Sequence, residues 1–379
     1  MKTTLLGGRT PRLFLRDYWQ KKPLLIRGAI PGFQGIVSRA EIFTLAHKTE
    51  AQSRLISHHR GKWQLEHGPF GKTQLRQLPR SNWTILVQDL NHFSDAGTAL
   101  LRQFSFIPYA RLDDLMVSYA ARGGGVGPHF DSYDVFLLQG EGTRRWRISR
   151  QKDLSLIPNL PLKILRSFRP EQEWELQPGD MLYLPPGYAH EGVALTDCAT
   201  YSIGFRAPSA QELAFNFLNH VQDELALDGM YADPDLKLQR RPAEISSAMV
   251  KKTAQIIERL SWTKGDYLHF LGRYLTEPKP HVFFVPPAVP AEIMEFRRSV
   301  LRGGALLDRK SRLLTHDTWA FMNGDRIAVS PQSRALLREL SDYWMIQSRN
   351  TIDRKSLALL YAWYCDGYLQ LRMESTKTW

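Results

Sequence analysis

The chain has 379 residues, 43% of them hydrophobic and 11% aromatic, which argues against an intrinsically disordered protein. This length predicts two or three domains, because single hydrophobic cores stop growing at about 250–300 residues. The formal net charge of +12, from 50 basic and 38 acidic residues, permits contact with nucleic acid or an anionic particle but does not establish it.

The cysteines and the hydropathy pattern indicate in which cellular compartment we expect the protein. Cys198 and Cys365 lie far apart in the sequence, which excludes a disulfide framework and a cysteine zinc site. The N-terminal stretch has no apolar run long enough for a signal peptide, and no later segment approaches the ~20 apolar residues of a membrane span. We therefore expect a cytoplasmic protein without membrane contact.

From about residue 82 to 206 the pattern is one of short strands broken by glycine and proline. Short strands at this spacing predict a β-sandwich or barrel. The stretches "QGEGT" and "QPGD" are typical of hairpin turns. The expected strands lie within residues 83–90, 114–121, 133–140, 144–149, 180–186 and 199–208.

After residue 208 the pattern changes from strands to helices. Ser209 and Glu212 have the spacing of a capping box, and apolar residues follow them at helical spacing. Two further helices are expected within residues 242–262 and 265–275. Their apolar faces would pack on one another or on a second subunit.

Five prolines in residues 277–290 indicate a linker, and a third unit follows it. A helix is expected near 291–302, a hairpin with an Asn-Gly turn at 318–330, and two helical stretches at 331–344 and 353–369. Helices combined with a β-hairpin resemble a winged helix.

His129 and Asp131 stand two residues apart at the start of an expected strand. Residues two apart in a strand project to the same face, so both side chains can reach one metal ion. A second histidine would complete the two-histidine, one-carboxylate triad of non-haem Fe(II) oxygenases. His190 is the best candidate, since it follows the strand expected at 180–186. The alternative is that the pair merely ends a loop, with the aspartate as a turn former.

Arg144 is the expected link to a co-substrate. Strand alternation puts it on one face with Trp146 and Ile148, so that a single arginine lies on an otherwise apolar face. A buried guanidinium requires a carboxylate, which it can bind through two hydrogen bonds. The distal carboxylate of 2-oxoglutarate would suit it. The alternatives are a pairing with a protein acid and an exposed position at the surface.

At these positions the sequence resembles the bacterial ribosomal-oxygenase branch of the JmjC hydroxylases. The motifs that carry the resemblance are long and specific, and they extend over at least residues 14–210. They are "GGGVGPHFDSYDVFLLQGEGTRRWRI", "LQPGDMLYLPPGYAHEG" and "YSIGFRAPS", with "RDYWQKKPLLIRGAI", "SRLISHHRGKWQLEHGPF" and "NWTILVQDLNHF" nearer the N-terminus.

The resemblance implies a fold, a reaction and partners. The fold is a mostly β catalytic core in residues 1–207, a cupin-like or JmjC-like double-stranded β-helix, followed by an all-α dimerisation region in residues 208–278 and a C-terminal winged-helix-like domain in residues 279–379. The reaction is hydroxylation of a ribosomal protein by Fe(II), 2-oxoglutarate and dioxygen. In the best-known bacterial members the target is an arginine of the large-subunit protein numbered sixteen, hydroxylated at Cβ. A homodimer is implied, while nucleic-acid contact stays open.

The resemblance also implies roles for individual residues. By motif position, His129, Asp131 and His190 are the iron ligands and form the catalytic centre. Arg144 and Ser118 match groups that hold 2-oxoglutarate.

Four further positions are candidates for the site. Thr200 stands where relatives often have asparagine, and its hydroxyl could still hydrogen-bond 2-oxoglutarate. Tyr133 shares the strand face of the expected ligand pair, so it could line the substrate pocket. Gln88 and Asn91 are substrate-pocket candidates as well, unless they are hydrogen-bonded residues of the core.

Two other functions remain open at this stage. One is the same chemistry on a different target, such as a histidine of another ribosomal protein or a demethylation. The other is a non-enzymatic winged-helix nucleic-acid binder with a vestigial metal barrel. The complete triad argues against the second. The basic charge favours neither, because the expected substrate is itself a basic protein.

Overall fold

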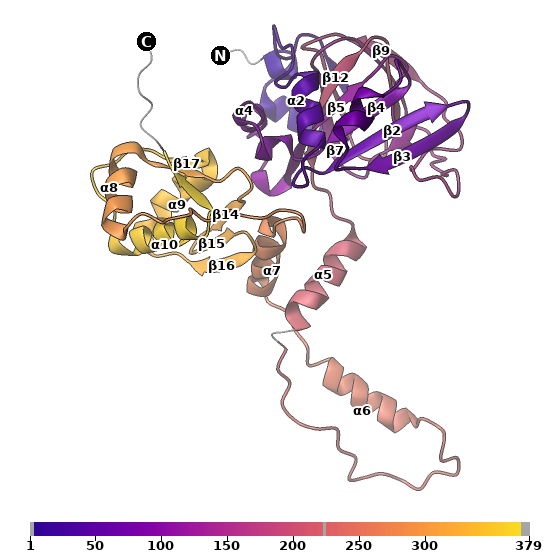
Figure 1. Cartoon of the computed structure of the whole chain (residues 1–379). Coiled ribbons are helices and arrows are strands. Elements are labelled where there is room, and N and C mark those ends of the chain that lie inside the picture. The colour runs from indigo at the N-terminus through magenta and orange to yellow at the C-terminus, as the bar shows by residue number, and fades with distance from the viewer. Residues whose placement is uncertain (1–3, 223–224, 373–379) are drawn as a thin grey trace. The chain divides into compact units, whose positions relative to one another are not determined.

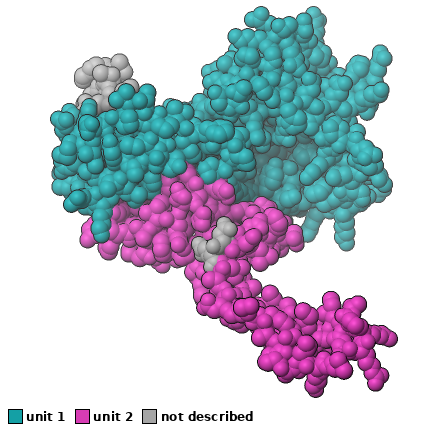
Figure 2. Space-filling model, turned by 60° about the horizontal axis from the view of Figure 1, so that its bottom comes forward, with its two compact units in different colours: residues 1–207, 278–311, 344–379 teal, residues 208–277, 312–343 magenta. Residues whose placement is uncertain are grey.

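The computed structural model describes residues 4–222 and 225–372, which form two compact units (Figure 2). Each unit is assembled from segments that are distant in the sequence. None of the helices in these described residues is long and apolar enough to cross a membrane. The first unit takes in residues 1–207, 278–311 and 344–379, and the second takes in residues 208–277 and 312–343.

The first unit is built on two antiparallel sheets (Figure 1). The larger sheet has the strand order β1-β10-β7-β12-β5-β4-β2-β3, and the smaller has the order β6-β11-β8-β9. This arrangement confirms the predicted double-stranded β-helix. The strands are β1 (Leu24–Ile26), β2 (Ser53–His59), β3 (Lys62–His67), β4 (Trp83–Val87), β5 (Leu112–Ala120), β6 (His129–Phe130), β7 (Asp134–Gln139), β8 (Arg144–Ser149), β9 (Gln172–Leu176), β10 (Met181–Leu184), β11 (Ala189–Ala194) and β12 (Cys198–Phe205).

Strand alternation gives the larger sheet two apolar faces. On the outer face, Phe136 and Tyr201 pack with residues of the N-terminal helices in the main core. On the inner face, Val135 packs against Trp146 of the smaller sheet. The interior between the sheets is therefore lined by every second residue of each strand. The helices of this part are α1 (Pro11–Asp17), α2 (Arg39–Ala46), α3 (Lys72–Arg76) and α4 (Asp95–Arg102), with short 3-10 turns η1 (Thr4–Leu6), η2 (Leu90–His92) and η3 (Tyr109–Arg111).

The first unit also contains C-terminal elements. A three-stranded sheet has the order β17-β13-β18, and two helices pack on its edge strand β18. The proline-rich segment 277–290, predicted as a linker, contains no helix or strand, but Lys279 and His281 contact Asp89 of the β core. The elements are α8 (Ile293–Gly303), β13 (Ala305–Leu307), β17 (Met345–Ile346), α10 (Arg354–Cys365) and β18 (Leu369–Leu371).

The second unit combines helices with a three-stranded meander. Ser209 caps the first helix by accepting a hydrogen bond from the Glu212 N–H, while the Glu212 carboxylate accepts one from Tyr274. The predicted Asn-Gly turn is present at Asn323 and Gly324, both with positive φ as such a turn requires. The elements are α5 (Ala210–Gln222), α6 (Ser247–Ile257), α7 (Lys264–Thr276), β14 (Leu313–His316), β15 (Trp319–Met322), β16 (Asp325–Ala328) and α9 (Pro331–Tyr343).

Candidate active site

Two histidines and an aspartate meet at the edge of the smaller sheet. Strand β6 pairs with β11 so that His129 lies directly opposite His190. Asp131 follows β6 immediately. One ligand atom from each residue lies within 4.8 Å of the other two, and His190 Nε2 is 3.6 Å from Asp131 Oδ2. The fold thus brings together the three residues that we predicted as metal ligands.

Backbone carbonyls orient both imidazoles. His129 Nδ1 lies 2.9 Å from the Gly127 carbonyl oxygen, and His190 Nδ1 lies 2.9 Å from that of Tyr188. A hydrogen on each Nδ1 is donated to a carbonyl, which leaves the Nε2 lone pair free for a metal. Burial and the neighbouring His129 lower the pKa of His190 to about 4, so this side chain is neutral at pH 7, as a ligand must be. The donor set fits Fe(II).

Arg144 is a buried cation in the barrel interior, with 4% of its surface exposed. Its guanidinium lies 5.7 Å from the ring centroid of Trp146, and that ring lies 5.9 Å from the ring of His190. Arg144 Nη1 donates a hydrogen bond to Ser118 Oγ over 3.3 Å. Its Nε and Nη2 are buried and have no partner within the described residues. Two free donors on a buried guanidinium fit a carboxylate ligand.

Ser118 and Thr200 lie opposite each other on β5 and β12. Ser118 Oγ lies 3.4 Å from the Thr200 carbonyl oxygen, to which it donates. The Thr200 hydroxyl donates to Gln139 Oε1 over 3.0 Å, so its one proton is already used. Gln139, a residue that sequence reasoning missed, donates in turn to the Glu141 carbonyl oxygen. Thr200 can therefore offer a further ligand only a lone pair.

The three substrate-pocket candidates have different surroundings. The Tyr133 hydroxyl hydrogen-bonds Asp131, and burial together with nearby carboxylates raises the pKa of Tyr133. Asn91 Oδ1 accepts a hydrogen bond from the Leu115 N–H over 3.0 Å, which ties its amide to the backbone of β5. Gln88 follows β4 and is half-buried. Of the three, Tyr133 is the one that the structure brings to the predicted metal ligands.

Sequence reasoning missed an acid pair beside Tyr133. A register shift between β5 and β12 makes Asp113 and Asp114 together oppose Gly204, in the manner of a β-bulge. Both carboxylates act electrostatically on the Tyr133 hydroxyl and add to the rise of its pKa, which burial and Asp131 mainly cause. A signal was present in the sequence, because counting back from Ser118 in steps of two places Asp114 on the same strand face.

Family models match the catalytic core and the winged helix of the predicted architecture. Residues 99–213 match the JmjC domain, and this range contains all three members of the triad. Residues 259–370 match a ROXA-like winged helix.

Individual proteins are also similar to this chain. The ribosomal protein uL16 3-hydroxylase of Escherichia coli (strain K12) is 36% identical over 325 residues, which make up 85% of this chain and 86% of that protein. A probable ribosomal oxygenase of Haemophilus influenzae is 40% identical over 233 residues, 60% of this chain and 55% of that protein. The solved structure of YcfD, a ribosomal oxygenase from Escherichia coli, in complex with cobalt and 2-oxoglutarate, matches with a TM-score of 0.82 at 34% identity. That match covers 95% of this chain and 97% of the other.

Proposed function

This chain belongs to the ribosomal oxygenases of the JmjC family, and from that premise we propose that it is an Fe(II)- and 2-oxoglutarate-dependent hydroxylase of a ribosomal protein. The observation that carries the proposal is the buried Arg144 guanidinium, two of whose nitrogens have no partner among the described residues. The guanidinium lies over the ring of Trp146, and that ring lies next to the ring of His190. Such a site offers a carboxylate anchor and a metal-binding triad in one enclosed barrel. A vestigial barrel would have no need to keep an unpaired buried cation, which is costly to maintain.

Each residue has a defined task in this proposal. His129, Asp131 and His190 hold the metal. Arg144 and Ser118 hold the distal carboxylate of 2-oxoglutarate, whereas Thr200 donates its hydroxyl proton to Gln139 and has none left for that carboxylate. When bound, Fe(II) couples the oxidative decarboxylation of 2-oxoglutarate by dioxygen to the insertion of one oxygen atom into a substrate C–H bond, with succinate and carbon dioxide as co-products.

We further propose that the target is an arginine side chain of uL16, hydroxylated at Cβ. The name of the similar Escherichia coli protein supports uL16. The acid pair Asp113 and Asp114 supports arginine, because carboxylates that act electrostatically on Tyr133, the pocket candidate next to the triad, suit a side chain that is always charged. A histidine target is mostly neutral at pH 7 and gains less from such a pair.

Mass spectrometry tests the proposal directly. The purified protein, supplied with Fe(II), 2-oxoglutarate and dioxygen, is incubated with uL16 and with other ribosomal proteins. We expect uL16 to gain one oxygen atom on an arginine. If oxygen is added instead to a histidine of another ribosomal protein, that histidine is the target. A lack of product on every ribosomal protein would overturn the proposed function.

Asp114→Asn is expected to weaken substrate use without harming the metal site. Loss of one partner of a buried charge pair costs about 2–5 kcal/mol, so the KM for uL16 should rise at least about thirtyfold. Slow succinate formation without substrate should stay near the wild-type rate, because Arg144 and the triad are intact. Asp235→Asn, in an exposed ion pair of the second unit, is the matched control. An unchanged KM would remove Asp114 from the substrate site.

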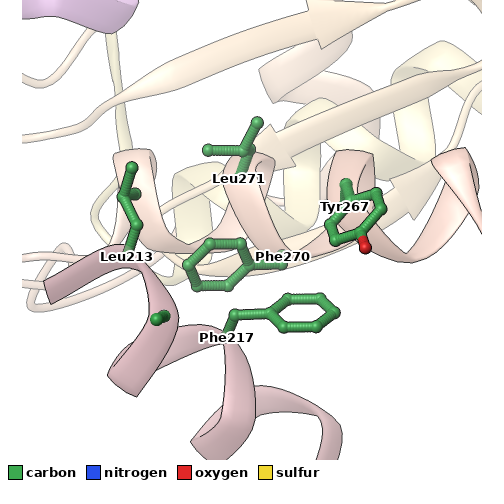
Figure 3. Close-up of a pocket in the computed structure, with 6 residues that line it drawn as sticks. Leu213, Phe217, Tyr267, Phe270 and Leu271 are labelled. Atoms are coloured by element: carbon green, nitrogen blue, oxygen red, sulfur yellow. The ribbon is translucent and has the colours of Figure 1, made fainter. Parts of the chain in front are cut away.

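We also propose a homodimer formed through the helices of residues 208–278. Helix α6 has no buried side chain among its 11 residues, and such a short helix is marginal unless its apolar face is covered. Phe215 and Leu218 on α5, and Val250 and Ile257 on α6, are mostly exposed. In Figure 3, side chains of α5 and α7 line an apolar groove of about 340 Å³. The groove is lined by Leu213, Ala214, Phe217, Tyr267, Phe270 and Leu271.

Charges on the exposed helical faces are expected to separate the subunits. Leu218→Glu combined with Val250→Glu places a carboxylate on each face, and two-fold symmetry repeats both changes in the partner. Analytical ultracentrifugation should then show a monomer where the wild type sediments as a dimer. Gln211→Glu on α5 is the control and should leave the dimer intact. A monomeric wild type would contradict the proposal.

The remaining assignments stay proposals. We propose that residues 1–207 form the catalytic domain, residues 208–278 the dimerisation region and residues 279–379 the winged-helix-like domain. We also propose a cytoplasmic location, which a ribosomal substrate supports.

A further inference from the structure

Lys279 lies among three carboxylates of the β core. Its Nζ is 2.9 Å from Asp89 Oδ1, 3.4 Å from Asp113 Oδ1 and 3.9 Å from Asp114 Oδ2. The lysine comes from the proline-rich segment 277–290, about 165–190 positions further along the chain than these acids. Only 24% of its side chain is exposed, so the contacts are largely removed from solvent and from salt screening.

Both carboxylate oxygens of Asp89 have partners in this cluster. Its side chain is 3% exposed, and His281 Nε2 lies 3.1 Å from its second oxygen, Oδ2. Its backbone is left-handed, with a φ of 52° that is uncommon outside glycine. That conformation directs the Asp89 N–H to Asp114 Oδ2 over 3.3 Å. Asp89 therefore fixes the lysine with its side chain and Asp114 with its backbone.

The cluster leaves Asp114 as the least neutralised acid. Lys279 contacts all three carboxylates, and Arg206 Nε lies 3.5 Å from Asp113 Oδ1. Three negative charges thus face two permanent positive ones, with His281 as the only titratable partner among these contacts. Asp114 has the longest distance to the lysine, and its Oδ1 lies over Gly204, where the absence of a side chain leaves room. One further cation would neutralise the third negative charge.

We propose that Lys279 is a positioning residue for the cationic substrate: it neutralises Asp89 and keeps Asp114 a carboxylate that can receive the substrate guanidinium. The inference rests on the proposed function, since it takes a charged arginine as the target. Lys279 itself does not touch the substrate. It acts through Asp114, because without the lysine three crowded carboxylates would share one permanent cation, Arg206, and would hold a proton among them.

Opposing effects of burial and neighbouring charges determine whether Asp114 is ionised. Burial raises its pKa to about 6, with Asp113 and Asp89 acting in the same direction, while Lys279 opposes them. The other charged or titratable groups that act on this cluster are His281, His92, Arg206 and Tyr133. Because Lys279 lowers the pKa of Asp114, its loss raises that pKa further, so that a larger share of Asp114 is protonated at pH 7 and becomes a carboxylate again as the pH rises.

Binding of uL16 to the Lys279→Met protein tests the proposal. The dissociation constant is measured anaerobically at pH 7 and pH 8.5, with Fe(II) and 2-oxoglutarate bound, so that no turnover is needed. A carboxyl loses about tenfold of its ionised form for each pH unit by which its pKa exceeds the pH, so we expect binding at pH 7 to be weaker by up to about tenfold. At pH 8.5 the variant should bind within about threefold of wild type.

Three variants separate charge from folding. Lys279→Arg keeps the cation and should bind like wild type. Asp89→Asn combined with Lys279→Met removes one charge of each sign and should recover most of the binding at pH 7. Lys252→Met breaks the exposed pair with Asp235 in the second unit and should have no effect. Succinate formation without substrate reports that each barrel is folded.

Two results would overturn the role of Lys279: unchanged binding at pH 7, or binding that is equally weak at both pH values. The second would mean a lost contact rather than a lost charge. If the wild type binds uL16 and the variants behave as expected while no oxygen is added to uL16, the proposed function fails and the role of Lys279 in cation binding stands.

Discussion

His129→Ala is expected to abolish hydroxylation of uL16. The substitution removes one of three side chains whose ligand atoms lie within 4.8 Å of one another, and two ligands cannot hold a catalytic metal in a defined geometry. Loss of an outer partner of a metal ligand alone costs about 10–100-fold in affinity or activity, so loss of the ligand itself should exceed that range. Mass spectrometry measures the product, and metal analysis of the purified protein measures bound iron.

The control for this variant must lose a histidine without touching the barrel. His316→Ala is suitable, because 57% of that side chain is exposed in a hairpin of the second unit. Its activity and iron content should match the wild type. His190→Ala should repeat the result of His129→Ala, although burial of His190 makes a check of thermal unfolding necessary. Normal turnover and normal iron content in both variants of the triad would show that the metal lies elsewhere.

Arg144→Met is expected to raise the KM for 2-oxoglutarate by at least about thirtyfold, because a buried charge-assisted carboxylate contact contributes about 2–5 kcal/mol. The free protein should not be destabilised by this change. In the absence of a carboxylate, Nε and Nη2 of Arg144 are buried without a partner, so methionine removes an uncompensated charge. The thermal midpoint without 2-oxoglutarate should therefore stay level or rise, whereas its increase on adding 2-oxoglutarate should shrink.

Arg147 supplies the matched control on the same strand. It projects to the outer face of β8 and forms an ion pair with Glu191. Arg147→Met should leave the KM for 2-oxoglutarate unchanged and lower stability slightly, since it breaks a satisfied pair. An Arg144→Met protein with a normal KM for 2-oxoglutarate would assign the co-substrate to another part of the barrel.

Much of this fold could be predicted because its signals are local. Short runs broken by glycine and proline identified six of the twelve strands that the structure describes in the core, and the helix cap at Ser209 and the Asn-Gly turn at Asn323 depend on a few neighbouring residues. The triad could be proposed because His129 and Asp131 stand two apart in a stretch expected to be extended, although in the structure β6 ends at Phe130, just before Asp131. The pairing that brings His190 to them was inferred from its place after a strand, and the register of β6 against β11 provides it.

The surroundings of the site depend on long-range register. Counting in steps of two places Asp114 on the strand face of Ser118, but the slip of β5 against β12 opposite Gly204, which sets Asp113 beside it, leaves no local pattern. The prolines of residues 277–290 predicted a linker. Lys279 in that segment nevertheless forms an ion pair with Asp89, which lies far earlier in the chain. Composition describes how stiff a segment is and does not show what it contacts.

The sequence by itself determined the chemistry that this protein can perform: two histidines and a carboxylate for a metal, and one arginine on an apolar strand face for a carboxylate. These follow from residue type and from the two-residue period of a strand. The tertiary structure decided the charge balance of the acid cluster. It brings three acids, one lysine and one arginine close together. Electrostatic energy depends on distances through space and on burial, and neither quantity can be counted along a chain.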